Sequence, residues 1–381
     1  MAGKFERKKQ KKAATWKKPV LIALAVILLL LVALVIAGVA YYYSMLGKIH
    51  QVDVPKINYT TAATEYVPET QPTEIREDTQ ETAEQVTEAP TEPHVASRED
   101  YINFLLIGQD AREGEQNNLA DTMILCTVNT YEKTLALTSI QRDTQLQVAG
   151  SYRDTSGTNH TYGGVKINMM YASGYQWGGT ADAMGVMNQV LYDNFGIEVD
   201  HNIEVNFDAF VAAIDAIGGI TVELSEAEAE YLNDDGKVWM EVSPGTCWID
   251  GYTALAYARM RKAAGDGDSD LKRTVRQRNV ISAVLAQLKT ISLNGLQNLV
   301  EEILPAVSTS MSSSEITAMI AKLLPILPEL QITNSGTCPH QFWGDVVDIF
   351  GNGVQHSVLK FNPQSEKKYM RALTLGEGTI E

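Results

Sequence analysis

The chain has 381 residues, of which 45% are hydrophobic, so it is long and apolar enough for one large or two ordinary domains with a real core. Disorder of the whole chain is therefore excluded. The formal net charge of −16 at pH 7 argues against general nucleic-acid binding.

The acidic total conceals a basic N-terminus. The first 18 residues contain eight Lys or Arg and a single acid, Glu6. Subtracting these from the totals of 31 basic and 47 acidic residues leaves 23 and 46, a net charge of about −23 for the rest of the chain. We predict that residues 1–18 form a basic cytoplasmic tail.

Residues 19–43 are almost entirely Leu, Ile, Val and Ala, carry no charge, and end in three tyrosines. A helix of this length would span roughly 37 Å, against about 30 Å for the hydrocarbon core of a bilayer. The alternative is a cleaved secretory signal, but its apolar core is usually only about 7–15 residues long. Basic residues before the run and acidic sequence after it predict a single-pass cell-membrane anchor, with the N-terminus cytoplasmic and the bulk extracellular.

Residues 44–97 are rich in Thr, Glu and Pro and show almost no apolar spacing. Such a segment buries too little surface to offset the entropy lost on ordering, so we predict a disordered extracellular tether. A coil of this length reaches roughly 40 Å. The folded domain is then predicted to cover residues 98–381.

The predicted domain alternates strands and helices. Continuous apolar runs are typical of strands buried on both faces, and apolar residues at helical spacing are typical of amphipathic helices. The predicted strands are 101–108, 123–129, 135–140, 203–206 and 220–224, and the predicted helices are 181–194, 207–217, 250–258 and 273–288. This order indicates an α/β fold of three layers, with a central mixed sheet flanked by helices.

Two aspartates stand at strand ends. Asp110 follows the first strand and Asp121 precedes the second. Because functional groups collect at strand ends in open α/β sheets, the two carboxylates could share one Mg²⁺ with substrate phosphate oxygens. The alternative is that each aspartate caps a turn.

Arginines near strand and helix ends form a second candidate group. Arg142 and Asp143 end the third strand, where an ordinary surface ion pair is the alternative. Arg259 and Arg261 are two positions apart, so they point to one side only if the chain has left the helix there.

The last predicted helix adds Arg273 and Gln277 on one face, with Arg276 beside them and Ser269 or Asp270 as its N-cap. Guanidinium groups match phosphate oxygens two at a time, and a helix N-terminus favours an anion. The arginines together therefore predict a phosphate site, whereas any one of them could lie on a solvated face.

Cysteine and histidine give little support to other chemistry. Cys126 lies in an apolar run and is expected to be buried, and Cys247 with Cys338 is the more plausible pair if a disulfide forms. The six histidines are scattered, and no Walker loop, CxxC pair or HExxH helix occurs, so nucleophilic, zinc and nucleotide-hydrolase mechanisms are disfavoured.

The order of these motifs resembles the LytR-CpsA-Psr family of bacterial cell-envelope proteins, from about residue 101 to 288. The motifs that carry the resemblance are Asn103–Asp110, Ala120–Met123, Ser139–Thr144, Lys166–Asn168, Asp215–Ile220, Asp250 with Gly251, Ala256–Arg261 and Arg273-x-x-Arg276-Gln277. The chain departs from the family at Gln141, where Pro is common, and at Leu119, where a basic residue is common.

The resemblance implies a Mg²⁺-dependent phosphotransferase that moves a glycopolymer, such as teichoic acid or capsule, from a polyprenyl-pyrophosphate carrier to peptidoglycan. Positioning and charge neutralisation supply most of the catalysis in such a transfer. By position, Asp110 and Asp121 would hold Mg²⁺, Asp143 would orient Arg142 or its loop, and Asp270 is a candidate base. The pyrophosphate would be bound by Arg142, Arg259, Arg261, Arg273, Arg276 and Gln277, although support of the helix is the alternative for Arg276 and for Arg278.

Two other functions use the same residues. One is a regulatory protein that binds polyprenyl phosphate without turnover, and the other is a lipid pyrophosphatase that needs no acceptor.

Overall fold

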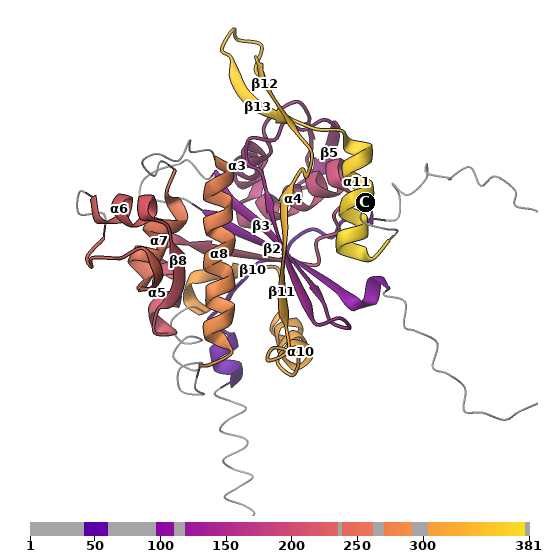
Figure 1. The fold of residues 1–381 in the computed structure, drawn as a ribbon. Helices are drawn as coiled ribbons and strands as arrows, with labels where there is room; N and C mark the ends of the chain where they lie inside the picture. The colour runs from indigo at the N-terminus through magenta and orange to yellow at the C-terminus, as the bar shows by residue number, and fades with distance from the viewer. Residues whose placement is uncertain are drawn as a thin grey trace, which may run out of the picture.

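A seven-stranded mixed sheet forms the centre of the structure, a computed structural model that describes residues 42–59, 97–109, 119–234, 238–261, 270–291 and 304–377 (Figure 1). The strand order is β1-β10-β7-β2-β3-β4-β11. The bounds are β1 His50–Gln51, β2 Tyr101–Gln109, β3 Ala120–Asn129, β4 Thr134–Ile140, β7 His201–Asn206, β10 Val307–Thr309 and β11 Gln331–Cys338.

The strands in the middle of the sheet run in both directions. β3 pairs antiparallel with both β2 and β4, whereas β7 is parallel to β2 and β11 is parallel to β4. The last residues of β2, β4, β7 and β11 therefore lie at the same edge as the first residues of β3. This is the edge where the sequence places its candidate site residues.

Helices α3, Ile167–Gly178, α4, Thr180–Phe195, and α11, Pro363–Leu375, cover one face of the sheet. Their apolar residues form one core with side chains of the sheet, such as Leu105 and Leu125, which are fully buried. The α4 helix ends at Gly196, whose φ of 69° lies in the left-handed region that glycine adopts without steric cost.

Helices α8, Asp270–Leu288, and α10, Ser313–Leu323, lie over the opposite face. Sheet residues such as Phe104 and Leu137 are buried there, but the helix residues facing them, Ile281 and Leu285 among them, are only partly buried. The two helices therefore cover an apolar surface that is less completely closed than the core on the other face.

A smaller unit packs beside α8 and has its own apolar core. It contains α5, Phe207–Ala216, α6, Glu226–Asn233, α7, Gly251–Arg259, and the two-stranded sheet of β8, Ile220–Leu224, and β9, Gly245–Ile249. The N-caps follow from sequence, since the side chains of Asn206 and Asp250 accept hydrogen bonds from the amides of Ala209 and Thr253.

The described fold also contains two further hairpins and two short 3₁₀ helices. The hairpins are β5, Gly150–Arg153, with β6, Asn159–Tyr162, and β12, Trp343–Val347, with β13, His356–Lys360. The 3₁₀ helices are η2, Arg98–Asp100, and η4, Leu304–Ala306.

The predicted elements and the mixed α/β class are confirmed, with one difference. The strand predicted at 220–224 forms, but it pairs with β9 outside the central sheet. The candidate disulfide between Cys247 and Cys338 does not form, because Cys126, Cys247 and Cys338 are free thiols, and Cys126 is buried as expected. Cys247 lies on β9 in the smaller unit, whereas Cys338 ends β11 in the main sheet.

The predicted tails and anchor fall mostly outside the described residues. Residues 1–41 are not described, and no helix within the described part of the chain has the length and apolar character needed to cross a membrane. The tether prediction is wrong at its start, because residues 42–46 are helical and β1 joins the main sheet beside β10. Apolar side chains such as Leu46, with 3% exposure, hold this part of the chain on the domain.

Candidate functional site

The candidate site lies at the sheet edge where β4 ends and β3 begins. Arg142 follows β4 by two residues, and Asp121 is the second residue of β3. The antiparallel register pairs Ser139 of β4 with Ile124 of β3, which brings the two positions together. The strands therefore fix both ends of the Arg142–Asp121 pair.

Three carboxylates surround the guanidinium of Arg142. Its Nη1 donates to Asp121 Oδ1 at 2.8 Å, while its Nε lies 3.2 Å from Asp270 Oδ2 and 3.5 Å from Asp143 Oδ2. Burial by itself would lower the pKa of Arg142, but Asp270, Asp121 and Asp143 outweigh it and raise that pKa above the ordinary arginine value. Arg142 is therefore a fixed positive charge at the centre of the site.

Arg273 reaches the same place from α8. It is 3% exposed, and its Nη2 donates to the backbone oxygen of Asp121 at 3.2 Å and to Asp270 Oδ2 at 3.0 Å. Burial lowers its pKa, with Arg142 and Arg261 acting in the same direction and Asp270 opposing them. The cations crowd one another, so an anion placed among them would be stabilised.

Gln277 extends this face of α8 by one turn. Its Nε2 donates to Thr122 Oγ1 at 2.8 Å, next to Asp121 on β3. The predicted pairing of Arg273 and Gln277 on one helix face is confirmed by these two contacts. The helix begins at Asp270 in the described chain, and Ser269 lies outside it.

The chain leaves the helix between Arg259 and Arg261, as the spacing of the two arginines requires. α7 ends at Arg259, and Met260 has an extended ψ of 126°. The Arg261 side chain is half exposed, and its Nη2 lies 3.8 Å from Asp121 Oδ2. The guanidinium carbon of Arg259 lies 4.4 Å from the centre of the Phe207 ring. Phe207 directly follows Asn206, which pairs with Gln109 at the end of β2.

The structure does not bring Arg276 into the site. Its Nε donates to Glu228 Oε1 at 2.6 Å and its Nη1 donates to the backbone oxygen of Met260 at 3.0 Å. These bonds join α8 to α6 and to the end of α7, so Arg276 supports the helix. Arg278 is also buried, and its Nη1 donates to Ser139 Oγ at 2.7 Å on β4.

Two residues of the site edge were not among the predicted site residues. Lys166, at the N-cap of α3, donates through Nζ to Asp143 Oδ1 at 2.6 Å and so fixes the carboxylate beside Arg142. Gln141 is 1% exposed, and its Nε2 has no hydrogen-bond partner among the described residues. Lys166 belongs to one of the motifs shared with the family, and Gln141 stands where the family commonly has Pro. The resemblance could therefore have indicated both positions, whereas the chemistry of the two residues alone did not.

Of the two predicted metal ligands, Asp121 lies within the described residues. Asp110 lies outside the described residues, although Gln109 before it pairs with Ala120, next to Asp121. Asp121 Oδ1 is bonded to Arg142, whereas Oδ2 has Arg261 at a distance too long for a hydrogen bond. One carboxylate oxygen therefore fits a Mg²⁺ whose other ligands are phosphate oxygens and water. Within the described ranges, no group of three His, Cys, Asp or Glu side chains could hold a metal alone.

The charges at this edge suit a polyanion with more than one phosphate. The cations are Arg142, Arg261, Arg273 and Lys166, and the carboxylates are Asp121, Asp143 and Asp270. Guanidinium donors from β4, the α7 end and α8 converge, so several phosphate oxygens could be bound from different sides. Buried nitrogens without hydrogen-bond partners in the described chain, such as Arg273 Nε, leave further donors.

The chain is thus a mixed α/β protein in which arginines and aspartates cluster where the strands of the central sheet end, an arrangement suited to binding an anion. The comparisons place the chain more narrowly, since the model of the LytR_cpsA_psr family matches residues 62–337. This protein belongs to the LytR-CpsA-Psr family.

Named relatives agree with this assignment. The chain is 31% identical over 253 residues to the polyisoprenyl-teichoic acid–peptidoglycan teichoic acid transferase TagU of Halalkalibacterium halodurans, covering 63% of this chain and 72% of the relative. It is 32% identical over 302 residues to biofilm regulatory protein A of Streptococcus mutans, covering 75% and 67%. The crystal structure of Bacillus subtilis TagT has 25% identity and a TM-score of 0.51, covering 77% of this chain and 95% of that one.

Proposed function

We propose that this protein is a membrane-anchored extracellular phosphotransferase that moves a glycopolymer from a polyprenyl-pyrophosphate carrier to peptidoglycan. The observation that carries the proposal is the convergence of Arg142, Arg261 and Arg273 on Asp121 at one sheet edge. The transferase name of the TagU relative supports the reaction class.

The arginines would bind the pyrophosphate of the donor and stabilise the charge that develops during transfer. An acceptor hydroxyl would attack the phosphorus that carries the glycan, and the bond from that phosphorus to the bridging oxygen would break. Polyprenyl phosphate would leave, and the glycan would be joined through a new phosphodiester. Electrostatic stabilisation by positioned arginines is the main protein contribution in phosphoryl transfer.

The carboxylates have different proposed roles. Asp121, with Asp110, would hold Mg²⁺, which when bound would neutralise charge on the phosphate oxygens. Asp143 positions Arg142 and is itself held by Lys166. Asp270 is the candidate acceptor of the hydroxyl proton, because it lies at the N-terminus of α8 beside both Arg142 and Arg273.

The partly buried apolar surface between the sheet, α8 and α10 would accept the polyprenyl chain. Ile281 and Leu285 on α8, and Met319 and Leu323 on α10, all pack on this surface, and none of the four is fully buried. Burial of each CH₂ group of a lipid there would contribute about 0.8 kcal/mol. We further propose that residues 19–43 anchor the chain, with the N-terminus in the cytoplasm and the domain outside.

A product-resolved assay tests the proposal against its two alternatives. The full-length protein in lipid vesicles is given a lipid-linked glycopolymer, Mg²⁺ and peptidoglycan. Transfer gives polymer bound to peptidoglycan together with polyprenyl phosphate. Cleavage of the donor at the same rate with and without peptidoglycan would establish a pyrophosphatase. Donor binding without cleavage would establish a regulatory binder, which the name of the Streptococcus mutans relative makes a specific alternative.

A further inference from the structure

We propose that the end of the domain opposite the site rests directly on the lipid bilayer. This basal face consists of Tyr43, Tyr131, Ile320 and Leu324, which come from the 42–46 helix, the turn after β3, α10 and the residue that follows α10. The inference rests on the membrane anchor proposed above, and it is independent of the transferase reaction.

The last residues of the apolar 19–43 run and the chain that follows them contact the domain directly. Tyr42 Oη donates to Thr317 Oγ1 of α10 at 3.1 Å, and Gln51 Nε2 donates to Ser313 Oγ at 2.6 Å. Between them, Leu46 and Ile49 are buried, and β1 pairs with β10. A helix that leaves the bilayer at Tyr43 therefore brings α10 to the membrane surface without an intervening spacer.

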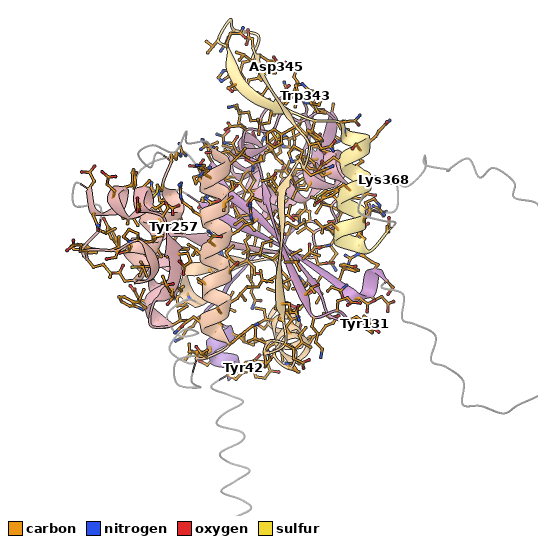
Figure 2. All side chains as sticks on the ribbon, in the orientation of Figure 1. Tyr42, Tyr131, Tyr257, Trp343, Asp345 and Lys368 are labelled. Atoms are coloured by element: carbon orange, nitrogen blue, oxygen red, sulfur yellow. The ribbon has the colours of Figure 1, made fainter. Side chains whose placement is uncertain are left out.

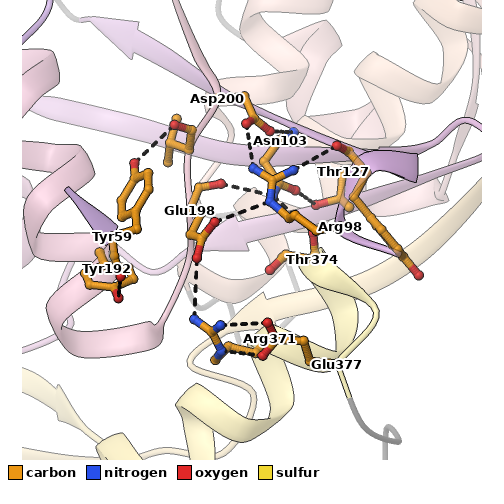
Figure 3. Close-up of polar contacts among 12 residues, drawn as sticks. Tyr59, Arg98, Asn103, Thr127, Tyr192, Glu198, Asp200, Arg371, Thr374 and Glu377 are labelled. Atoms are coloured by element: carbon orange, nitrogen blue, oxygen red, sulfur yellow. Dashed lines mark hydrogen bonds and ion pairs between the residues drawn. The ribbon is translucent and has the colours of Figure 1, made fainter. Parts of the chain in front are cut away.

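Residues 60–96 of the Thr/Glu/Pro-rich segment do not separate the domain from the predicted anchor, because the chain on both sides of them is fixed at one corner of the domain (Figure 3). Before residue 60, Tyr59 Oη donates to the backbone oxygen of Val199 at 3.2 Å. After residue 96, Arg98 Nη2 donates to Asp200 Oδ1 at 2.6 Å and Arg98 Nε donates to Glu198 Oε2 at 3.3 Å. Residues 60–96 thus connect two positions that both contact residues 198–200.

The basal face exposes large apolar side chains. The exposed fractions are 57% for Tyr43, 50% for Tyr131, 44% for Ile320 and 53% for Leu324. Ile320 and Leu324 are one helical turn apart, and each lies about 100° around the helix from its core-facing neighbour, Met319 or Leu323. Interfacial amphipathic helices place aliphatic and aromatic side chains into the headgroup region in this way.

The basal face and the site lie at opposite ends of the sheet. Gln331, one residue after the α10 connection, pairs with Thr134 at the start of β4, whereas Arg142 follows the end of β4. Figure 2 shows Tyr42 and Tyr131 at one end of the molecule and Trp343 and Asp345 of the β12–β13 hairpin at the other. At about 3.3 Å per residue, β4 alone separates the site from the bilayer by roughly 25 Å.

A bilayer fits this surface better than a second copy of the chain. A stable protein interface buries about 800 Å² on each partner, and four half-exposed side chains fall well short of that area. The same end carries both Lys322 and Glu315, so the contact depends on apolar side chains more than on charge. We therefore expect contact with neutral phospholipid that changes little with salt.

Lipid-dependent quenching at matched positions tests the inference. In full-length protein carrying Cys247→Ser, which removes the half-buried thiol, Leu324→Cys or Val354→Cys is labelled with bimane. Leu324 and Val354 are both 53% exposed, but Val354 lies in the β12–β13 connection. The protein is reconstituted in phosphatidylcholine vesicles with and without a nitroxide-bearing phospholipid, and insertion is checked by alkaline carbonate extraction.

We expect the nitroxide lipid to quench the label at position 324 several-fold more than the label at position 354, at low and high salt. Equal quenching at the two positions in protein that resists extraction would overturn the membrane contact and leave the anchor and the transferase proposal standing. Protein released by carbonate would overturn the anchor and the contact together. A bimane signal at 324 that depends on protein density but not on the nitroxide would indicate contact between copies and would also overturn the inference.

Discussion

Arg142 Nη1 and Asp121 Oδ1 are 2.8 Å apart and join the end of β4 to the start of β3. The same guanidinium lies within 3.5 Å of Asp143 and Asp270, so one cation holds the acidic side chains of three segments in place. A phosphate group that binds Arg142 must therefore share it with these carboxylates or displace them. Mg²⁺ bound to Asp121 would lower the competition from that carboxylate.

Substitutions of Arg273 and Arg276 should have different effects, the first on catalysis and the second on stability. Both arginines are buried on α8, but Arg273 contacts Asp121 in the site whereas Arg276 contacts Glu228 outside it. Arg273→Met is expected to lower the turnover number about 100-fold, as loss of one positioned donor does. Arg276→Met is expected to keep most of the turnover per folded molecule but to destabilise the fold by about 3 kcal/mol, since Glu228 loses its buried partner. Transfer assays and urea unfolding measure the two effects. Similar turnover losses in both variants would contradict the assignment of Arg276 to the scaffold.

Asp121→Asn should abolish the response of the protein to Mg²⁺. The amide cannot supply an anionic ligand and also loses the ion pair with Arg142. Asp143→Asn is the control, because Asp143 contacts the same arginine from a position that is not proposed to bind metal. Mn²⁺ binding followed by electron paramagnetic resonance, in the presence of inorganic pyrophosphate, gives a readout apart from activity. Equal metal affinity in the Asp121→Asn and wild-type proteins would exclude Asp121 as a ligand.

Glu204 should make the fold less stable as the pH rises. Burial raises the pKa of Glu204, although the hydrogen bond from the Tyr171 hydroxyl acts to lower it. The folded state therefore binds more protons than the unfolded state above the ordinary glutamate pKa, and stability falls through that window by up to about 1.4 kcal/mol per pH unit.

Glu204→Gln removes this titration and keeps an acceptor for Tyr171. Urea unfolding of the detergent-solubilised protein should show the variant to be more stable than wild type at pH 8, with the difference shrinking towards pH 5. A difference that grows as the pH falls would contradict the raised pKa.

Thiol titration checks the absence of disulfides. All three cysteines are free in the structure, and burial raises the pKa of Cys126 to about 12. Cys338 is also buried, whereas Cys247 is partly exposed. A thiol reagent should modify one cysteine in the native protein and three after unfolding without reductant. Only one reactive thiol in the unfolded protein would instead show that two are bridged.

The sequence predicted the main strands and helices because their apolar runs are long and their caps are explicit. It also placed Arg273 and Gln277 on one face, since residues four positions apart always lie on the same side of a helix. It could not place Arg276. Arg276 points about 100° away from Gln277 on the helix, and only the tertiary contact with Glu228 shows that this direction leads to α6 and not to the site.

Other features depend on contacts between distant segments. The docking of residues 42–59 rests on hydrogen bonds to α10 and on pairing with β10, more than 250 positions away, which a composition rich in polar residues does not reveal. Lys166 joins the site through Asp143, a contact across the β5–β6 hairpin that no local pattern encodes. The β8–β9 pair likewise formed outside the main sheet, because strand patterns do not specify partners.

Transfer by Arg142 variants tests the central claim most directly. Full-length wild type, Arg142→Lys and Arg142→Ala are compared for polymer transferred from a lipid-linked donor to peptidoglycan, with thermal unfolding as the check on folding. We predict that wild type forms the phosphodiester product, that Arg142→Lys loses most of the rate because lysine lacks the planar fork of donors, and that Arg142→Ala loses at least about 100-fold. Folded Arg142→Ala protein that transfers polymer at the wild-type rate would contradict the account.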